Sequence, residues 1–279
     1  MKPFSITSVI IALCLLVVAC ATVPITGRKQ TKLLPESSLN EMALTSYRQF
    51  LNENRVSTDQ IQVNKVREVG QNIRGAVETF YRAQGMTNKL SGFSWEFNLV
   101  DDPTVNAWAM PGGKIVVYTG LLPIAENTDG LAVVMGHELA HALAHHGNER
   151  MSQGLLVQLG GIGLAVALSE KPAVTQALFM QAYGVAAQVG AMLPFSRLHE
   201  SEADEIGLYL MAIAGYNPEE AAPFWRRMNA GAGSRPPAFL STHPDPENRA
   251  RRLQALIPKA RIYAQKYGAG QSRPTQKFY

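Results

Sequence analysis

The residues best suited to chemistry are two histidines and a glutamate in the sequence His-Glu-Leu-Ala-His at residues 137–141. This motif lies in an apolar run, Leu131–Ala144, that predicts a helix. Side chains four residues apart on a helix are only about 40° apart around its axis, so both imidazoles face one point. Neutral imidazole is a good zinc ligand, and a carboxylate beside an open coordination position can take a proton from water. The motif therefore indicates a zinc hydrolase in which Glu138 is the base.

A catalytic zinc site needs a third protein ligand, and the acidic segment at residues 200–205 offers one. Glu200 and Asp204 are four residues apart and share a helical face, whereas Glu202 points about 200° away from Glu200. We therefore assign Glu200 as the third ligand. Asp204 is then expected to accept the second ring N–H of a ligand histidine, most simply that of His137. Taken alone, the segment has a solvated acidic face as its alternative interpretation.

These two segments resemble the gluzincin family of zinc metallopeptidases, which includes HtpX, BepA, LoiP and the mitochondrial OMA-type proteases. In that family a His-Glu-x-x-His helix is completed by a Glu-x-x-Ala-Asp helix. Further likeness at residues 106–114, 119–122 and 240–244 extends the resemblance over roughly residues 36–257. The resemblance implies a zincin-like domain, one zinc ion per chain, metalloendopeptidase activity and quality control of envelope or membrane proteins.

His243 matches a family position at which, in BepA-like members, a loop histidine approaches the zinc and holds the site closed. Two interpretations are open for His243 in this chain: a gate of that kind, or an ordinary turn residue before Pro244. Pro244 and Pro246 make the loop rigid, which would aim the imidazole. The sequence does not identify an oxyanion donor besides zinc, and the candidates are His243, Tyr209 and Arg249.

The elements that must position these residues are mostly helices. Helical spacing of apolar residues predicts helices at residues 39–51, 63–84, 127–146 and 196–214. Between about residues 93 and 119 the apolar period changes to two, which indicates a small antiparallel sheet packed beside the metal-binding helix. The predicted fold is therefore α+β and predominantly helical.

Two short strands, at residues 106–110 and 114–118, are predicted on either side of the turn Pro111-Gly112-Gly113. One of these strands should form an exposed edge of the sheet. In a zinc peptidase such an edge can hold the substrate as an added strand, with little selectivity for side chains. We expect Asn106 and Ala109 to contact the substrate in this way.

Residues 155–193 are rich in alanine, glycine, leucine and valine. The apolar stretch from Leu155 to Leu168 is too short for a comfortable membrane span. We therefore predict a buried or membrane-surface helical hairpin that would cover the active-site cleft. A segment that crosses the membrane is the alternative.

The first residues predict the compartment. Lys2 precedes an apolar stretch, so residues 1–19 are interpreted as a signal peptide. The sequence Val-Val-Ala-Cys that ends at Cys20 is similar to a bacterial lipobox, which predicts lipidation of Cys20 and a lipidated linker at residues 20–35. Because Ala21 is not an aspartate, the periplasmic face of the outer membrane is favoured over the inner membrane. A simple cleaved signal or an uncleaved anchor is the alternative.

Composition limits what holds the mature domain together and what it binds. The two cysteines, Cys14 and Cys20, leave no thiol for a disulfide within residues 36–257, so the core and zinc must stabilise that domain. The net charge of +4 comes without interleaved aromatic and basic residues, which argues against binding to nucleic acid. Residues 258–279 are expected to form a flexible tail.

The predicted function is a zinc-dependent metalloendopeptidase, with His137, His141 and Glu200 as ligands and Glu138 as the catalytic base. Its predicted substrates are misfolded or unassembled cell-envelope proteins, with the envelope assembly machinery as a further partner and the N-terminal lipid as the contact with the membrane. The alternative is an envelope chaperone or assembly lipoprotein whose peptidase activity is latent.

Overall fold

The computed structural model describes residues 20–171, 173–187, 193–230, 237–268, 270 and 272–279. The chain divides into two compact units. The first unit comprises the residues up to Glu36 and residues 145–199, and the second comprises residues 37–144 and 200–279. The signal peptide predicted at residues 1–19 lies outside the described residues.

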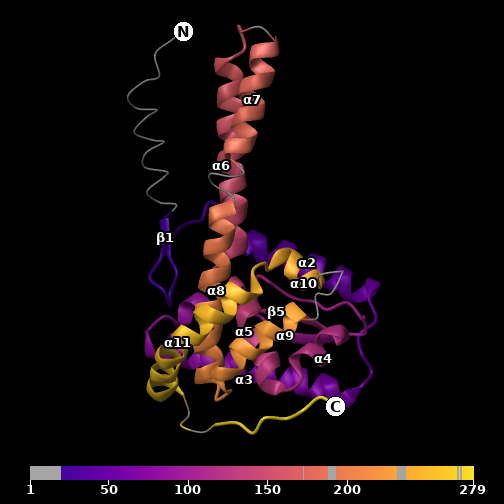
Figure 1. Ribbon diagram of the computed structural model, residues 1–279. Coiled ribbons are helices and arrows are strands. Elements are labelled where there is room, and N and C mark those ends of the chain that lie inside the picture. The colour runs from indigo at the N-terminus through magenta and orange to yellow at the C-terminus, as the bar shows by residue number, and fades with distance from the viewer. Residues whose placement is uncertain (1–19, 172, 188–192, 231–236, 269, 271) are drawn as a thin grey trace. The chain divides into compact units, whose positions relative to one another are not determined.

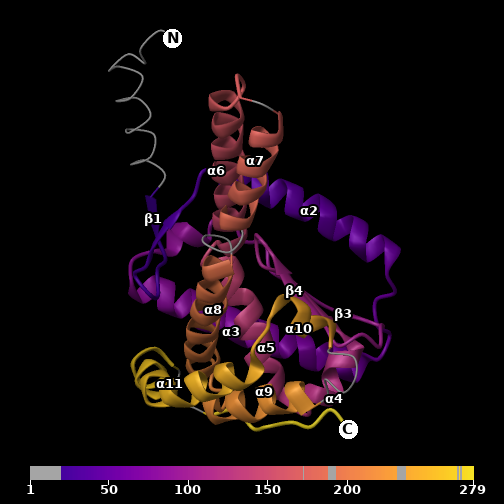
Figure 2. The same cartoon turned by 45° about the horizontal axis from the view of Figure 1, so that its top comes forward.

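The second unit is built around a three-stranded sheet with the strand order β3-β5-β4, and Figure 2 labels its two outer strands, β3 and β4. These strands are β3 (Glu96–Val100), β4 (Ala107–Met110) and β5 (Lys114–Tyr118). Strands β4 and β5 form the antiparallel pair that the sequence predicts. Strand β3 runs parallel to β5, because β4 follows β3 in the chain but pairs on the other side of β5. The predicted sheet is therefore present, but its pairing is mixed.

Helices make up most of the rest of the second unit. They are α2 (Glu36–Glu53), α3 (Gln60–Ala83), α4 (Leu122–Ala125), α5 (Thr128–Leu143), α9 (Ala221–Ala230), α10 (Ala238–Thr242) and α11 (Pro246–Tyr267), with short 3-10 helices η1 (Thr87–Leu90), η2 (Thr119–Leu121) and η4 (Pro218–Glu220). Helix α8 (Leu193–Ile213) belongs to this unit from Glu200 onward. The helices predicted from apolar spacing are confirmed as α2, α3, α5 and α8, with ends that shift by a few residues.

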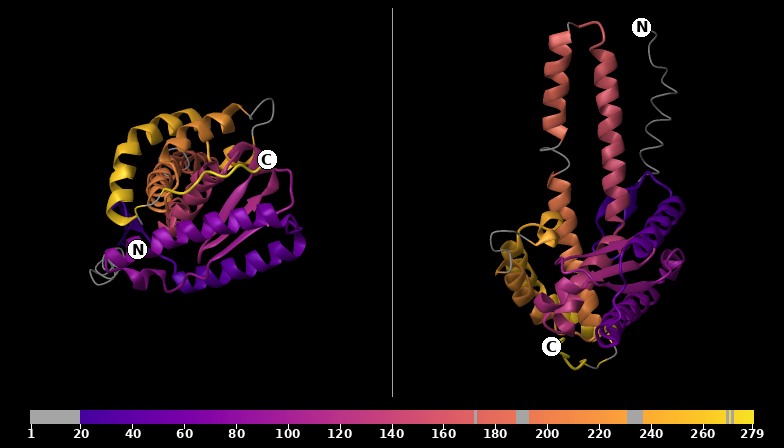
Figure 3. Two further views of the ribbon diagram at one scale, coloured as in Figure 1. Left: turned by 90° about the horizontal axis from the view of Figure 1, so that it is seen from below. Right: turned by 90° about the vertical axis from the view of Figure 1, so that its right-hand side faces the viewer.

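Helices cover both faces of the sheet in the second unit. On one face, Tyr47 and Phe50 of α2 pack against Trp108, and the ring centroids of Phe50 and Trp108 are 4.8 Å apart. On the other face, α3 comes so close that a Cβ added at Gly70 would lie 2.4 Å from the ring of Phe97. Helix α5 contacts α3 as well as β4 and β5, so it lies on this second face. Helices α9 and α11 pack on each other in the same unit (Figure 3).

Helix α5, which carries the histidine motif, has a defined start and a defined end. The side chain of Asn127 accepts hydrogen bonds from the backbone N–H groups of Asp129 and Gly130, as an N-cap does. At the other end, His145 has a φ of 54°, in the left-handed region, which a helix cannot continue through. The sequence predicts that this helix reaches His146, and the left-handed residue explains why it ends earlier.

The C-terminal segment differs from the flexible tail expected at residues 258–279. Helix α11 continues through Pro258, so the first part of that segment is helical. Further on, the N–H of Thr128 donates to the carbonyl of Gln276, and Phe278 is buried. The expectation rested on local composition, which does not register pairing with a segment far away in the sequence. We call residues 273–278 the C-terminal strap.

The first unit contains a short hairpin and a pair of long helices. The hairpin strands are β1 (Cys20–Thr22) and β2 (Lys29–Thr31), and the helices are α6 (His146–Ala167) and α7 (Ala173–Ala187). Helices α6 and α7 run side by side (Figures 1 and 3), and the Tyr183 hydroxyl of α7 donates to the carbonyl of Val157. Among the described helices, none combines the length and the apolar character that crossing a membrane requires.

A buried ion-pair cluster ties the β1–β2 hairpin to α6. The two terminal nitrogens of Arg28 donate to the two carboxylate oxygens of Glu149 at 2.9 and 2.7 Å. Glu149 Oε2 also lies 2.9 Å from His199 Nε2, and the ring of His199 stacks on His146 with centroids 4.3 Å apart. Burial raises the pKa of Glu149, but the hydrogen bonds with His199 and Arg28 outweigh burial and lower the pKa to about 2.

Candidate metal centre

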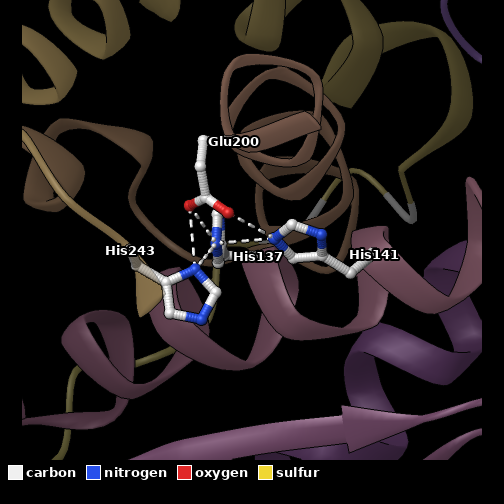
Figure 4. A group of neighbouring side chains, drawn as sticks. All are labelled: His137, His141, Glu200 and His243. Carbon is white, nitrogen blue, oxygen red and sulfur yellow. Dashed lines mark hydrogen bonds and ion pairs between the residues drawn. The ribbon is translucent and has the colours of Figure 1, made fainter. Parts of the chain in front are cut away.

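Four side chains of metal-ligand type converge in the second unit (Figure 4). His137 and His141 come from α5, Glu200 comes from α8, and His243 follows α10. One ligand atom from each of the four residues lies within 4.8 Å of the ligand atoms of the other three. The structure therefore brings together the three residues assigned as ligands from the sequence, and it adds His243 to them.

The spacing of these atoms fits a tetrahedral metal ion. The Nε2 atoms of His137 and His141 are 3.1 Å apart. Glu200 places Oε2 3.3 Å from His137 Nε2 and Oε1 3.3 Å from His141 Nε2. Ligand atoms around a tetrahedral zinc ion lie about 3.3 Å from one another, and two histidines with a glutamate are a known donor set of catalytic zinc sites. The residues present therefore fit a zinc ion.

His243 lies where a fourth ligand would lie. Its Nδ1 atom is 2.8 Å from Glu200 Oε2 and 3.1 Å from His137 Nε2. The ring is buried and stacks on Phe239, with centroids 4.4 Å apart. Catalytic zinc sites leave the fourth corner to water or substrate. In this conformation, His243 takes the place that a catalytic water would need.

Glu138 lies buried beside the ligand group. Its Oε1 atom is 3.4 Å from His243 Nε2 and makes no hydrogen bond with the described residues. Burial raises the pKa of the Glu138 carboxyl, while nearby charge on His243 and His137 acts in the opposite direction. A carboxyl group with a raised pKa is suited to accept a proton and return it within one reaction cycle.

Asp204 and Arg249 hold His137 through its other ring nitrogen. Asp204 Oδ1 is 3.0 Å from His137 Nδ1, and His137 is the histidine that we expected Asp204 to contact. Arg249 grips Asp204 with two hydrogen bonds, from Nε to Oδ2 at 2.9 Å and from Nη2 to Oδ1 at 2.5 Å. The guanidinium lies 3.5 Å over the ring of Trp225. Arg249 also contacts the ligand group directly, with Nη2 2.9 Å from His137 Nδ1 and Nη1 3.1 Å from Glu200 Oε2. It thus supports the ligands, a role other than the oxyanion donor that the sequence offers.

The carboxylates of the cluster stabilise positive charge. Burial and the charge of Arg249 lower the pKa of His137, but its hydrogen bonds with Asp204 and Glu200 outweigh both and raise that pKa to about 9. Burial also opposes ionisation of Glu200, yet hydrogen bonds with His137, His141 and His243 lower its pKa. A site that holds protons this firmly offers the same negative charge to a metal cation, which competes with protons for these groups.

The two helices that carry the ligands approach each other at a pair of glycines. A Cβ added at Gly136 would lie 2.9 Å from the carbonyl oxygen of Gly207, and one added at Gly207 would lie 2.7 Å from the backbone nitrogen of His137. Glycine inside a helix costs about 0.5–1 kcal/mol relative to alanine. The close approach sets the separation of α5 and α8, and therefore the reach of Glu200 to both histidines. Sequence reasoning missed this pair, although Gly136 directly precedes the motif.

Strand β4 is an edge of the sheet, as the substrate hypothesis requires. The carbonyl of Asn106 accepts a hydrogen bond from the N–H of Tyr118, so the Asn106 backbone faces β5. Because backbone groups alternate along an antiparallel strand, those of Ala107 and Ala109 point away from β5. The contacts of Asn106 and Ala109 with a substrate stay predictions, and the backbone of Ala109 has the direction that such a contact needs. Ala107 is buried, and its N–H donates to Asn106 Oδ1. The N–H of Phe239, in α10, donates to the carbonyl of Val105 just before β4, so α10 lies next to the start of this edge (Figure 2).

Comparison with known proteins places this site in a family. The model of peptidase family M48 matches residues 69–257, which include both metal segments, the sheet and His243. The chain belongs to peptidase family M48. This confirms the family expected from the two metal segments, and the structure confirms the α+β fold.

Curated relatives agree with the family. The mitochondrial metalloendopeptidase OMA1 of Schizosaccharomyces pombe is 37% identical over 175 residues, which are 62% of this chain and 50% of the relative. Human OMA1 is 30% identical over 245 residues, 85% of this chain and 46% of the relative. The beta-barrel assembly-enhancing protease of Escherichia coli is 29% identical over 161 residues, 56% of this chain and 33% of the relative. The chain thus spans about half the length of its OMA1 relatives, or less.

These relatives correct the predicted compartment. The sequence predicts a periplasmic protein that is anchored to the outer membrane by a lipid on Cys20, but the OMA1 relatives are named as mitochondrial proteins. The predicted localisation is therefore contradicted. A lipobox is a pattern of only four residues, so it arises easily by chance at the end of an apolar segment. In the structure, Cys20 is the first residue of β1.

Proposed function

We propose that this chain is a zinc-dependent metalloendopeptidase. The supporting observation is the convergence of His137, His141 and Glu200 on one point, with the buried carboxyl of Glu138 beside them. Membership of peptidase family M48 and the metalloendopeptidase names of the OMA1 relatives support the same activity.

The mechanism assigns one task to each residue of the site. His137, His141 and Glu200 would hold the zinc ion, and Asp204 fixes the ring of His137. A bound zinc ion would supply Lewis-acid chemistry, because it lowers the pKa of water and polarises a peptide carbonyl. Glu138 takes the proton of the attacking water and later gives it to the departing amine.

The substrates that suit this site are unfolded or unassembled proteins, in a quality-control role. Strand β4 offers the backbone groups of Ala109 to an extended peptide. Backbone recognition requires a substrate segment that is free of its own secondary structure, which folded proteins rarely expose. Such recognition gives breadth instead of a narrow sequence preference.

The test of the activity is the variant Glu138→Gln. We expect cleavage of an unfolded protein to fall about 10²- to 10⁴-fold, because a positioned base contributes that much. Zinc content, measured by mass spectrometry, should stay at that of the parent protein. The exposed residue Glu41 in α2 supplies the control Glu41→Gln, which should cleave normally. Normal turnover by Glu138→Gln would refute the assigned base, and proteins retained by this inactive variant would identify the substrates.

We further propose that His243 holds the site closed. Its imidazole fills the fourth corner of the ligand group, and α10, which precedes it, is hydrogen-bonded to the start of the β4 edge. The same closure favours the second candidate function, a chaperone or assembly factor with latent peptidase activity. In that case the Glu138→Gln variant should still restore the function of the parent protein in cells that lack it.

Replacement of His243 by alanine tests the gate. We expect His243→Ala to cleave an unfolded protein several-fold faster, since the fourth corner becomes available. His145→Ala is the matched control, because His145 pairs with Glu36 outside the ligand group. Loss of turnover would instead make His243 an oxyanion donor, and unchanged turnover would remove it from the mechanism.

A further inference from the structure

The first unit exposes a large apolar surface. Most of the large apolar side chains that are exposed among the described residues lie between residues 151 and 198. They include Leu155, Leu156, Leu159, Ile162, Val166 and Phe179. Exposed apolar patches of this extent mark sites of contact with a partner or a membrane.

On α6 the exposed apolar residues form a stripe that faces away from α7. Leu155, Leu159, Ile162 and Val166 are spaced by three or four residues, so they share one face of the helix. The opposite face is the one that approaches α7, because the carbonyl of Val157 accepts a hydrogen bond from Tyr183. The pairing of α6 and α7 therefore leaves the stripe uncovered within the first unit.

The residues beside the stripe distinguish a lipid surface from a second copy of the chain. Helices that pair in water carry charged residues next to their apolar seam. Here the neighbours of the stripe are Gly163, Ala165 and the uncharged Gln158, and between Met151 and Ser196 the sequence has only two charged residues, Glu170 and Lys171. A helix pair without charge on any side fits an apolar solvent.

We propose that the α6–α7 hairpin binds a lipid bilayer and lies along the boundary between headgroups and acyl chains. Charged residues stand only at the two ends of the hairpin, where this position keeps them in water. Arg150 and Arg197 flank it at the base, and both are exposed. In its turn the charges of Glu170 and Lys171 cancel, so the positive charge that complements anionic headgroups comes from the two arginines.

The N-terminal sequence brings the same unit to a membrane. The apolar run at residues 6–19 directly precedes β1. Retained in the mature chain, such a run would hold the first unit at a membrane. The following β1–β2 hairpin is tied to the first turn of α6 by the pair of Arg28 and Glu149. This proposal is independent of the peptidase activity, since none of its residues belongs to the ligand group.

The experiment uses the full chain with zinc and vesicles of phosphatidylcholine and phosphatidylglycerol that carry bromine on their acyl chains. Bromine quenches a tryptophan that enters the acyl region. We expect the emission added by Leu159→Trp to shift to the blue and to be quenched severalfold more than that of Met42→Trp. Met42 is the matched site, because it is 60% exposed on α2. The native tryptophans give the same background in both variants.

A second substitution sharpens the result. Ile162→Asp, added to Leu159→Trp, should abolish the extra quenching by placing a charge in the stripe, whereas Ile162→Leu should preserve it. Equal quenching of Leu159→Trp and Met42→Trp would overturn the proposal. A blue shift that needs no vesicles and grows with protein concentration would also overturn it, in favour of a second copy of the chain.

Discussion

Two buried clusters in this molecule use the same residue types for different purposes. In the second unit, His137, His141 and Glu200 point their ligand atoms at one position. In the first unit, the two histidines next to Glu149 lie flat on each other, with their ring planes only 17° apart. Stacked rings do not direct their nitrogens to a common point. Two histidines and a carboxylate thus indicate a metal site only when the backbone makes them converge.

The charge balance of the two clusters differs as well. Both oxygens of Glu149 are held by Arg28, so its negative charge is matched by a permanent cation. Glu200 Oε2 also lies 3.1 Å from a permanent cation, Arg249 Nη1, but the two Glu200 oxygens face three imidazoles, which lose their protons when a metal binds. The first cluster is therefore expected to be structural, and the second is open to exchange between protons and metal.

Removal of a metal ligand should give the largest difference between the two clusters, measured as a loss of zinc affinity. We expect His141→Ala to weaken zinc binding about a thousandfold or more, because a site with three protein ligands loses one of them. Calorimetric titration with zinc measures this. His146→Ala, in the other cluster, should still bind one ion per chain with the affinity of the parent protein. A loss of zinc in both variants would show that the clusters are not distinct.

Glu149→Gln should affect stability instead of metal binding. The pKa of Glu149 is lowered to about 2 from its ordinary value of 4.5, so its ionised form stabilises the folded state above pH 4.5. This contribution, roughly 3 kcal/mol, is lost as the pH falls from 4.5 towards 2. Urea unfolding at pH 7 should show the loss in Glu149→Gln, and the difference from the parent protein should shrink in acid. The exposed Glu170 supplies the control Glu170→Gln, and a constant difference across this pH range would contradict the assignment.

The smallest of these effects is expected for Asp204→Asn. An amide still reaches His137 Nδ1 but carries no charge for Arg249 to balance, so zinc affinity should fall about 10- to 100-fold. Competition with a chelator measures this change. The control is Glu205→Gln on the same helix, whose carboxylate accepts from Tyr209 and Lys259 instead. Unchanged affinity in Asp204→Asn would remove Asp204 from the support of the site.

Local patterns predicted the parts of the site that lie within one element. The spacing of His137 and His141, the shared face of Glu200 and Asp204, and the β4–β5 hairpin all follow from periods of a helix or a strand. Parts that depend on distant segments were not predictable in this way. The sequence offers Arg249 only as a candidate oxyanion donor, and its packing on Trp225 and its pairing with Asp204 appear only in the folded structure.

The same limit applies to the fold. The parallel pairing of β3, the contact of Gly136 with Gly207, and the C-terminal strap each join segments that no local pattern relates. The predicted compartment was wrong for another reason. It rested on the four residues that end at Cys20, and the names of the relatives contradict it.

The C-terminal strap ties the completion of the metal-binding helix to the timing of translation. Gln276 bonds to Thr128 at the start of α5, across 148 positions of the chain. At about 5–20 residues per second, a ribosome needs on the order of ten seconds to cover that distance. During this interval the first turn of α5 lacks its hydrogen bonds with Gln276. A chaperone therefore has time to bind the nascent helix before the C-terminal strap pairs with it.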